Sequence, residues 1–254
     1  MAKATVAMQM YSLRDLVKED YAGTLKKVAK IGYRAVQVSG VGNSTPKEIR
    51  KAMDDLQLGS AGTHLGLEMM EKEFEKVVEI TKTLRAGYAI IPYVPEERRQ
   101  SADDWRRLAE SFTDIGRRLK AEGLGLAYHN HSFEFEKFDG KYAYDILFET
   151  VDRDLVQTEI DLYWVKYGGA DPVAYLKRHA HHMDIVHFKD MGKGTERPMV
   201  PVGTGILDWA GIVAACEAGG TKWACIEQDN YVAPLQPLEA ARISFENCKK
   251  WGLA

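Results

Sequence analysis

The stretch LGLAYHNHSFEFEKFDGKYAYDILFETVDRDLVQTEID, residues 124–161, decides the fold. It opens with a short apolar run, Leu124–His129, and closes with a second one, Val156–Asp161. Between them, Tyr142–Val151 has the apolar spacing of an amphipathic helix. Two strands joined through a helix predict a parallel βαβ unit. Both apolar runs end in a side chain that can bind a metal or carry a proton, a histidine and an aspartate.

The same alternation continues over the whole chain. Further short apolar runs are Val6–Met10, Ala35–Ser39, Leu58–Thr63, Tyr88–Pro92, Ile185–Lys189 and Trp223–Glu227. Further helical patterns are about Tyr21–Ile31, Pro46–Leu56, Met69–Leu84, Ala102–Ala121, Pro172–Arg178, Trp209–Ala218 and Leu238–Trp251. Eight strands alternating with eight helices predict one α/β domain over residues 1–254, a single (β/α)8 TIM barrel.

An open, doubly wound sheet is the alternative fold for such an alternation. That fold places a glycine-rich, phosphate-binding turn directly after its first strand. Here the first strand is followed by Gln9-Met10-Tyr11-Ser12-Leu13-Arg14-Asp15, which contains no glycine. We therefore favour the closed barrel.

The composition is that of an ordinary globular domain, with 45% hydrophobic and 28% charged residues. The formal net charge is −3 and no long basic run occurs, so we expect no nucleic-acid partner. Three cysteines without a C-x-x-C pair predict buried thiols in a reducing compartment. We expect a cytoplasmic protein without membrane contact, because no secretory h-region precedes the first strand and no stretch is apolar enough to span a bilayer.

The ends of the predicted strands carry side chains suited to chemistry. In a barrel these carboxyl ends converge on one face. In chain order the residues are His64; Tyr128, His129, Asn130 and His131; Asp161; His187, Lys189 and Asp190; and Glu227, Gln228 and Asp229. The last four strands each offer a histidine or carboxylate. This mixture predicts one divalent metal ion, Mn²⁺, Zn²⁺, Co²⁺, Fe²⁺ or Mg²⁺, rather than Ca²⁺.

The segment after strand five leaves the roles of two histidines and a glutamate to be assigned. Alternation places His129 and His131 on the same side of the chain. We expect His129, nearer the barrel, to bind the metal and His131, one step further out, to meet the substrate. Glu134 lies between two phenylalanines. It is predicted either to be a carboxyl of raised pKa that exchanges protons or to be an exposed loop residue.

These motifs together resemble one family. They are Gln9–Asp15, Tyr128–Phe135, Asp161–Trp164, His187–Asp190, Val202–Gly205 with Asp208-Trp209, and Glu227–Asp229. They resemble the sugar phosphate isomerase/epimerase branch of the xylose isomerase-like TIM barrel superfamily, over nearly the whole chain. The resemblance does not extend to the DNA-repair endonuclease branch, whose additional histidines and basic surface are missing from the sequence.

The resemblance implies a metal held by Glu, Asp, His and Glu on strands five to eight. Asp161, His187 and Glu227 match the last three, whereas His129 stands where relatives have glutamate. It also implies that Glu227 is both ligand and base, and that His131 or Glu134 returns the proton. Expected substrate contacts are His64, Trp164, Lys189, Asp190 and Gln9, with Tyr163 beside Trp164 in the wall of the pocket.

The leading functional prediction is a metal-dependent isomerase or epimerase that acts on a sugar or keto-sugar through an enediolate. The runner-up is a metal-dependent lyase or dehydratase on a keto-sugar or inosose-like ring, which needs only one base plus an acid. His129 in place of a glutamate favours this runner-up somewhat. A sugar-binding barrel without turnover is the alternative of another class. The expected partner is a small sugar, more plausibly unphosphorylated, and a homo-oligomer is compatible with the sequence.

Overall fold

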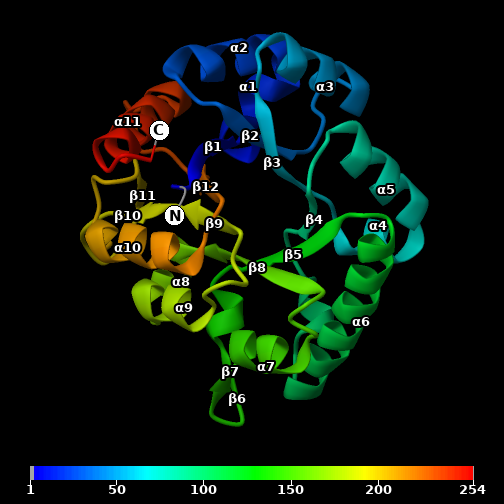
Figure 1. Ribbon diagram of the computed structural model, residues 1–254. Helices are drawn as coiled ribbons and strands as arrows, with labels where there is room; N and C mark the ends of the chain where they lie inside the picture. Colours follow the sequence, from blue (N-terminus) through cyan, green and yellow to red (C-terminus); the bar gives the residue numbers. More distant parts are fainter. Residues whose placement is uncertain (1–2, 254) are drawn as a thin grey trace.

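In the computed structural model, which describes residues 3–253, eight parallel strands close into a barrel (Figure 1). The barrel strands are β1 (Thr5–Gln9), β2 (Ala35–Ser39), β3 (Gly59–His64), β4 (Tyr88–Ile91), β5 (Gly125–His129), β8 (Val156–Asp161), β9 (Ile185–Phe188) and β12 (Trp223–Ile226). Each strand pairs with the barrel strand before and after it in sequence, and β12 pairs with β1. The predicted (β/α)8 barrel is confirmed, with every predicted strand in place.

Helices surround the strands on the outside. They are α1 (Arg14–Glu19), α2 (Tyr21–Ile31), α3 (Pro46–Asp55), α4 (Leu67–Lys72), α5 (Phe74–Thr83), α6 (Ala102–Ala121), α7 (Ala143–Thr150), α8 (Leu162–Tyr167), α9 (Pro172–Arg178), α10 (Trp209–Gly219) and α11 (Pro237–Lys250). The one helix predicted over Met69–Leu84 is two, because Glu73 leaves the helical region with φ −127° and ψ 43°. The short helices α1 and α8 were not predicted. Among the described residues no helix is long and apolar enough to cross a membrane.

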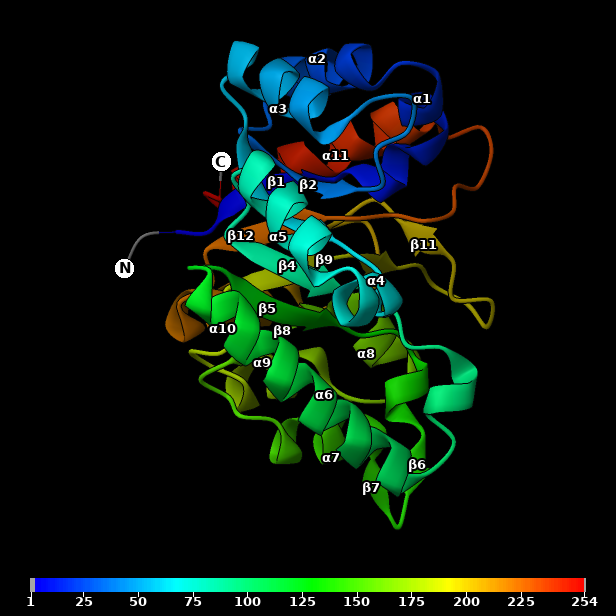
Figure 2. The same ribbon diagram turned by 90° about the vertical axis from the view of Figure 1, so that its right-hand side faces the viewer.

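Several short elements lie beyond the carboxyl ends of the barrel strands. They are the 3-10 turns η1 (Met10–Leu13), η2 (Glu96–Arg98) and η3 (Phe133–Phe135), and the pairs β6 (Lys137–Phe138) with β7 (Lys141–Tyr142) and β10 (Asp190–Met191) with β11 (Met199–Val200). In the side view of Figure 2 the described chain begins at the left and β11 lies at the right, beyond the carboxyl ends of the strands. The segment that follows β9 therefore contains a small hairpin, β10 with β11, on the mouth side.

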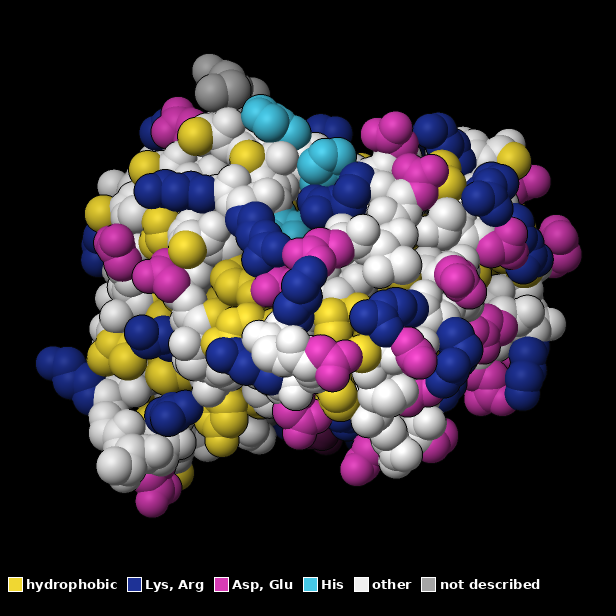
Figure 3. Space-filling view, turned by 90° about the horizontal axis from the view of Figure 1, so that it is seen from below, with side chains coloured by type: hydrophobic (Ala, Val, Ile, Leu, Met, Phe, Trp, Pro, Cys, Tyr) yellow, Lys and Arg dark blue, Asp and Glu magenta, His cyan; other side chains and the backbone are white. Residues whose placement is uncertain are grey.

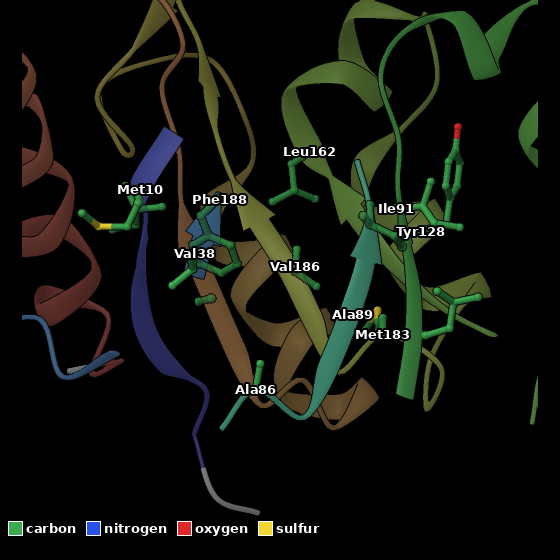
Figure 4. Close-up of a cluster of buried hydrophobic side chains, with 14 of the residues drawn as sticks. Met10, Val38, Ala86, Ala89, Ile91, Tyr128, Leu162, Met183, Val186 and Phe188 are labelled. Carbon is green, nitrogen blue, oxygen red and sulfur yellow. The ribbon is translucent and has the colours of Figure 1, made fainter. Parts of the chain in front are cut away.

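The hydrophobic core has two parts. The larger one lies between the strands and the helices; Val186 and Phe188 of β9 belong to it and are among the side chains labelled in Figure 4. The smaller one fills the inside of the barrel with short side chains, such as Ala7 and Ala127. Because these inner side chains are short, the mouth half of the barrel has room for polar groups.

The surface is mixed in charge. The face that carries α7 shows lysines, arginines and acidic side chains interspersed around a hydrophobic area (Figure 3). Cys216, Cys225 and Cys248 are all buried as free thiols, which confirms their predicted burial.

Candidate metal centre and reaction cleft

The four side chains predicted to bind a metal converge at the barrel mouth. His129, Asp161, His187 and Glu227 are all buried, and each offers a ligand atom within 4.8 Å of the others. His129 and Asp161 are the last residues of β5 and β8, His187 is the last but one of β9, and Glu227 directly follows β12. Strand pairing places these side chains at the same height in the barrel: Asp161 of β8, for example, is paired with His187 of β9. The sequence therefore identified a real cluster, although its ability to hold a metal is a proposal.

A second acidic residue, not predicted, lies one step deeper. Glu159 is completely buried and sits opposite His129 in the strand register. Its Oε2 atom lies 2.7 Å from His64 Nε2, 3.2 Å from His129 Nδ1 and 3.2 Å from His187 Nε2. A second candidate ligand set thus consists of His64, His129, Glu159 and His187. The signal was present in the sequence: Glu159 precedes Asp161 by two residues and so shares its inward face.

Two glutamines support this deeper layer. Gln37 Nε2 donates to Glu159 Oε1 at 2.5 Å, and Gln37 Oε1 lies 2.7 Å from His187 Nε2. Gln9 Nε2 in turn donates to Gln37 Oε1. The expectation that Gln9 contacts substrate is not supported, because Gln9 is fully buried beneath His64 and does not line the cleft. Its inward direction from β1 places it below the strand ends.

In this deeper layer, buried carboxylates lie next to histidines, and each group changes the pKa of its neighbours. Burial alone would raise the pKa of Glu159, but His187 and His64 outweigh burial and hold it well below its usual range. Burial would lower the pKa of His187, yet Glu159 and Glu227 raise it to about 10. His129 differs: burial and the neighbouring His187 lower its pKa to about 4, so it is a neutral imidazole near neutral pH. A neutral imidazole is the form that binds metals.

The donor set fits a divalent ion. Burial raises the pKa of Asp161 to about 7, and its Oδ2 atom accepts no hydrogen bond, although Lys189 Nζ lies 3.4 Å away. His129 Nδ1 makes no hydrogen bond either, although Glu159 Oε2 lies 3.2 Å away. Both atoms thus keep a lone pair that is not used in a hydrogen bond and could bind a cation. Imidazole nitrogens and carboxylate oxygens suit Zn²⁺, Mn²⁺, Co²⁺ or Fe²⁺.

Lys189 brings a positive charge to the edge of this cluster. Its side chain is almost completely buried, and its Nζ atom lies 2.6 Å from Asp229 Oδ2, 3.2 Å from Glu227 Oε2 and 3.4 Å from Asp161 Oδ2. Burial would lower the pKa of Lys189, but the three carboxylates outweigh it and raise the pKa. Lys189 is therefore a fixed ammonium group, and the same charge helps to keep the pKa of Glu227 well below its usual range despite burial.

A cleft of about 460 Å³ opens above the cluster. Its lining includes five residues predicted for the site, namely His64, His129, His131, Lys189 and Glu227. Two tyrosines that were not singled out, Tyr11 and Tyr93, also line it and are 44% and 47% exposed. The cleft therefore joins the candidate ligands to a rim of aromatic rings, which suits a substrate with polar edges and C–H faces. We call it the reaction cleft.

His131 stands in the wall of the reaction cleft. Its ring stacks on Phe133 with centroids 5.6 Å apart and meets the edge of Tyr93 at 5.9 Å. The ring of His129 lies 5.0 Å away. This aromatic packing holds the imidazole in one orientation, and burial with the neighbouring His129 and Lys189 lowers its pKa to about 2. The arrangement agrees with the predicted order, His129 at the cluster and His131 nearer the substrate.

Glu134 lies outside the reaction cleft, which corrects its predicted contact with substrate. Its side chain is fully buried in η3. One carboxyl oxygen accepts a hydrogen bond from Tyr128 Oη at 2.5 Å, and the other accepts one from the His131 backbone N–H at 2.9 Å. The raised pKa expected from its apolar surroundings is present, because burial raises it to about 8. Glu134 thus fixes the segment that carries His131.

Asp190 also faces away from the reaction cleft. Its carboxylate accepts hydrogen bonds from the backbone N–H groups of Gly203 and Gly205, both at 2.9 Å, and from the indole N–H of Trp209 at 2.8 Å. The side chain is fully buried. The expectation of substrate contact at Asp190 is therefore corrected: its acceptor atoms are occupied in organising the long segment after β9.

Trp164 lies at the edge of the reaction cleft rather than in its lining. Its ring is 5.6 Å from that of His131, and Lys189 Nζ lies 5.1 Å from its centroid. Tyr163 is buried against Met191 and Met199, and its hydroxyl donates to the Arg197 carbonyl. Both rings line a neighbouring cavity. Neither ring therefore lines the reaction cleft, and their predicted contact with substrate stays a prediction.

The neutral form of Glu134 gives a testable dependence of stability on pH. Between its ordinary pKa of 4.5 and its raised pKa of about 8, the unfolded chain has released this proton and the folded chain retains it. We therefore expect Glu134 to lower the free energy of unfolding by about 1.4 kcal/mol per pH unit as pH rises through this window. Glu134→Gln should remove this part of the slope. Urea unfolding of both proteins at the two ends of the window measures it, and parallel pH profiles would contradict it.

Comparisons with known proteins are consistent with this architecture. Residues 25–251 match the family described as Xylose isomerase-like TIM barrel. An inosose dehydratase of Clostridium beijerinckii is 26% identical over 201 residues, covering 70% of this chain and 66% of that protein, so the chain spans about two thirds of its length. A crystal structure of a sugar phosphate isomerase/epimerase from Parabacteroides distasonis superposes with a TM-score of 0.84 at 23% identity, over 97% of this chain and 98% of that one. The IOLI protein, solved with a zinc atom, superposes with a TM-score of 0.77 at 14% identity, over 97% of each chain.

Proposed function

Because the chain belongs to the xylose isomerase-like TIM barrel family, we propose that it is a metal-dependent enzyme that removes a proton beside the carbonyl of a sugar-like ketone. The observation that carries this proposal is that candidate ligands and His131 line the same cleft. A divalent ion held by His129, Asp161, His187 and Glu227 would polarise a substrate carbonyl and so acidify the neighbouring C–H bond.

The residues of the chain supply the remaining requirements. Glu227 is held as a carboxylate and is suited to accept the proton. Lys189 is held as an ammonium group and stabilises negative charge that develops on a substrate oxygen. His131 is a neutral imidazole in the free chain, because burial, His129 and Lys189 lower its pKa. Negative charge that develops on a substrate oxygen beside it would raise that pKa, so His131 is placed to exchange a proton with the substrate. The aromatic rim orients the ring and excludes water from it.

We propose that proton removal leads to elimination, as in a dehydratase. The acidic residues that line the reaction cleft, Glu227 and Asp229, both follow β12, and the position on β5 where relatives carry glutamate is His129. Epimerisation by paired glutamates requires two carboxylates on opposite sides of the substrate. The described residues that line the cleft do not provide such a pair. The similarity to an inosose dehydratase supports the same choice. Isomerisation or epimerisation, the leading prediction from the sequence, remains the second candidate because His131 supplies a possible second proton carrier.

Metal binding can be measured without knowledge of the substrate. We expect the purified chain to bind one divalent ion and His187→Ala to bind none, because His187 belongs to both candidate ligand sets. Elemental analysis after dialysis against a metal mixture gives the stoichiometry. Equal metal content in the two proteins would remove the basis of the proposal.

The reaction itself is tested with an inosose and a panel of ketoses in deuterated buffer. Elimination converts the ketone into a product that has lost water, whereas epimerisation returns an isomer that carries deuterium on the carbon beside the carbonyl. We expect loss of water with at least one cyclic polyol ketone. Deuterium exchange without loss of water would favour the epimerase, and binding without either change would identify a sugar-binding barrel.

A further inference from the structure

A second cavity adjoins the reaction cleft on the side of α8. It measures about 490 Å³, and four aromatic residues belong to its lining: Tyr163, Trp164, Tyr167 and Tyr231. We call it the aromatic annex. Its size lies within the range of small-molecule sites, about 300–1,000 Å³, so it can hold a ring of its own. A free monocyclic sugar in the reaction cleft would leave the annex empty.

The two cavities are neighbours at the mouth. Asn230 lines both of them. Ser132 lines the annex and directly follows His131, which lines the reaction cleft. Trp164 forms part of the annex wall and has its ring 5.6 Å from that of His131. A molecule bound across Asn230 would therefore contact both the reaction cleft and the annex.

The chemistry of the annex suits a sugar ring. Tyr167 is 42% exposed although it is a large aromatic residue, and its ring lies 5.6 Å from that of Trp164 at an angle of 73°. The guanidinium of Arg197 lies 5.2 Å from the Tyr167 ring and donates to the Tyr167 carbonyl, which holds the end of α8 in place. Aromatic rings bind the C–H faces of sugars, while Glu196, Arg197 and Asn230 in the lining offer partners for hydroxyl groups.

The indole of Trp164 adds an independent indication of a ligand. Its Nε1 atom is buried and has no hydrogen-bond partner among the described residues. Buried indole N–H groups ordinarily donate a hydrogen bond. Because Trp164 lines the annex, a hydroxyl group of a molecule bound there is a candidate acceptor once the indole ring adjusts.

We propose that the annex is a binding site for a second hexopyranose ring, so that the preferred substrate is a glycoside of the ketone. This inference rests on the proposed function, because it names the substrate class of the same mouth. The reaction cleft holds the ring that loses its proton, and Tyr167 and Trp164 contact the second ring. The elimination is that of the proposed function: the C–H electron pair forms the new double bond as the C–O bond of a hydroxyl group on the reacting ring breaks, and the departing hydroxide takes a proton from the site and leaves as water, while the second ring stays attached.

Binding of unreactive sugars tests the annex independently of turnover. The probes are glucose and three disaccharides of glucose that differ in linkage, cellobiose, maltose and trehalose, measured by calorimetry with the full chain. We expect at least one disaccharide to bind about tenfold more tightly than glucose. Tyr167→Ala should abolish this preference by lowering disaccharide affinity toward that of glucose, whereas Tyr167→Phe should retain it. Tyr93→Ala, in the reaction cleft, should weaken both classes of probe.

Two results would overturn the inference. One is equal affinity of all three disaccharides and glucose for the wild-type chain. The other is a preference that survives Tyr167→Ala. Phenyl β-glucoside is included as a separate probe: if it alone binds more tightly than glucose, the annex accepts an aromatic group and not a sugar. A disaccharide preference in a chain that fails the metal and solvent-exchange tests would uphold the annex and refute the proposed reaction, so the two failures are distinguishable.

Discussion

His131→Ala is expected to lower turnover by roughly 10²–10⁴-fold while leaving the metal content unchanged, the usual range for loss of a proton-transfer group. The reason is positional. His131 lines the reaction cleft but belongs to neither candidate ligand set. His129 belongs to both sets, so His129→Ala should instead lower metal affinity. Turnover of the substrate found by the ketone panel and metal content by elemental analysis are measured for both variants.

The matched control is His182→Ala. His182 precedes β9 and therefore lies at the opposite end of the barrel from the mouth. Loss of this imidazole should change neither turnover nor metal content. If His131→Ala loses the metal while His129→Ala keeps it, the two histidines have the opposite roles. If both variants retain full turnover, the proposed proton path is wrong.

The strands and their ends could be predicted from the sequence because one physical pattern specifies both. Short apolar runs alternate with amphipathic ones, and only parallel strands with crossover helices satisfy that pattern eight times. Once the barrel is accepted, the last residue of each strand must reach the mouth. This reasoning placed His129, Asp161, His187 and Glu227 in one cluster without knowledge of any contact.

The deeper layer was not predicted because its polar residues lie inside strands rather than at their ends. Glu159 and Gln37 occupy positions that read as ordinary strand interior, where a polar residue has no local partner in the sequence. Their partners come from other strands: Gln37 is 122 residues away from Glu159 along the chain. Closure of the barrel brings them together, and burial is tolerated because each polar group is paired.

The residues just beyond the strand ends were the least predictable. Strand alternation assigns directions only while the chain remains extended. After His187 the chain continues to Lys189, which still points into the site, but Asp190 begins a hairpin and faces the segment after β9. After His129 the chain enters η3, and Glu134 turns behind the cleft wall. Local turns, which have no period, therefore decided which of the predicted residues reach the cleft.

Lys189→Met is expected to destabilise the metal-free chain by about 3–5 kcal/mol, because it leaves buried carboxylates without their positive partner. Asp161, Glu227 and Asp229 all lie within 3.4 Å of Lys189 Nζ. A bound divalent ion would supply the missing charge, so adding metal should restore most of the lost stability. The same substitution removes a positive charge beside the candidate ligands, and metal affinity should therefore rise rather than fall.

Urea unfolding with and without metal measures the stability of the variant, and competition with a chelator measures its affinity. Lys222→Met is the control: Lys222 also pairs with an aspartate, at 2.7 Å, but its side chain is 64% exposed. An exposed pair contributes about 0–1 kcal/mol, so this variant should unfold nearly as the wild type does, with or without metal. If Lys189→Met binds metal more weakly than the wild type, the ammonium group supports the ion instead of competing with it. An unchanged affinity would instead indicate that the metal binds at the deeper set of Glu159, His64, His129 and His187, away from the charge of Lys189.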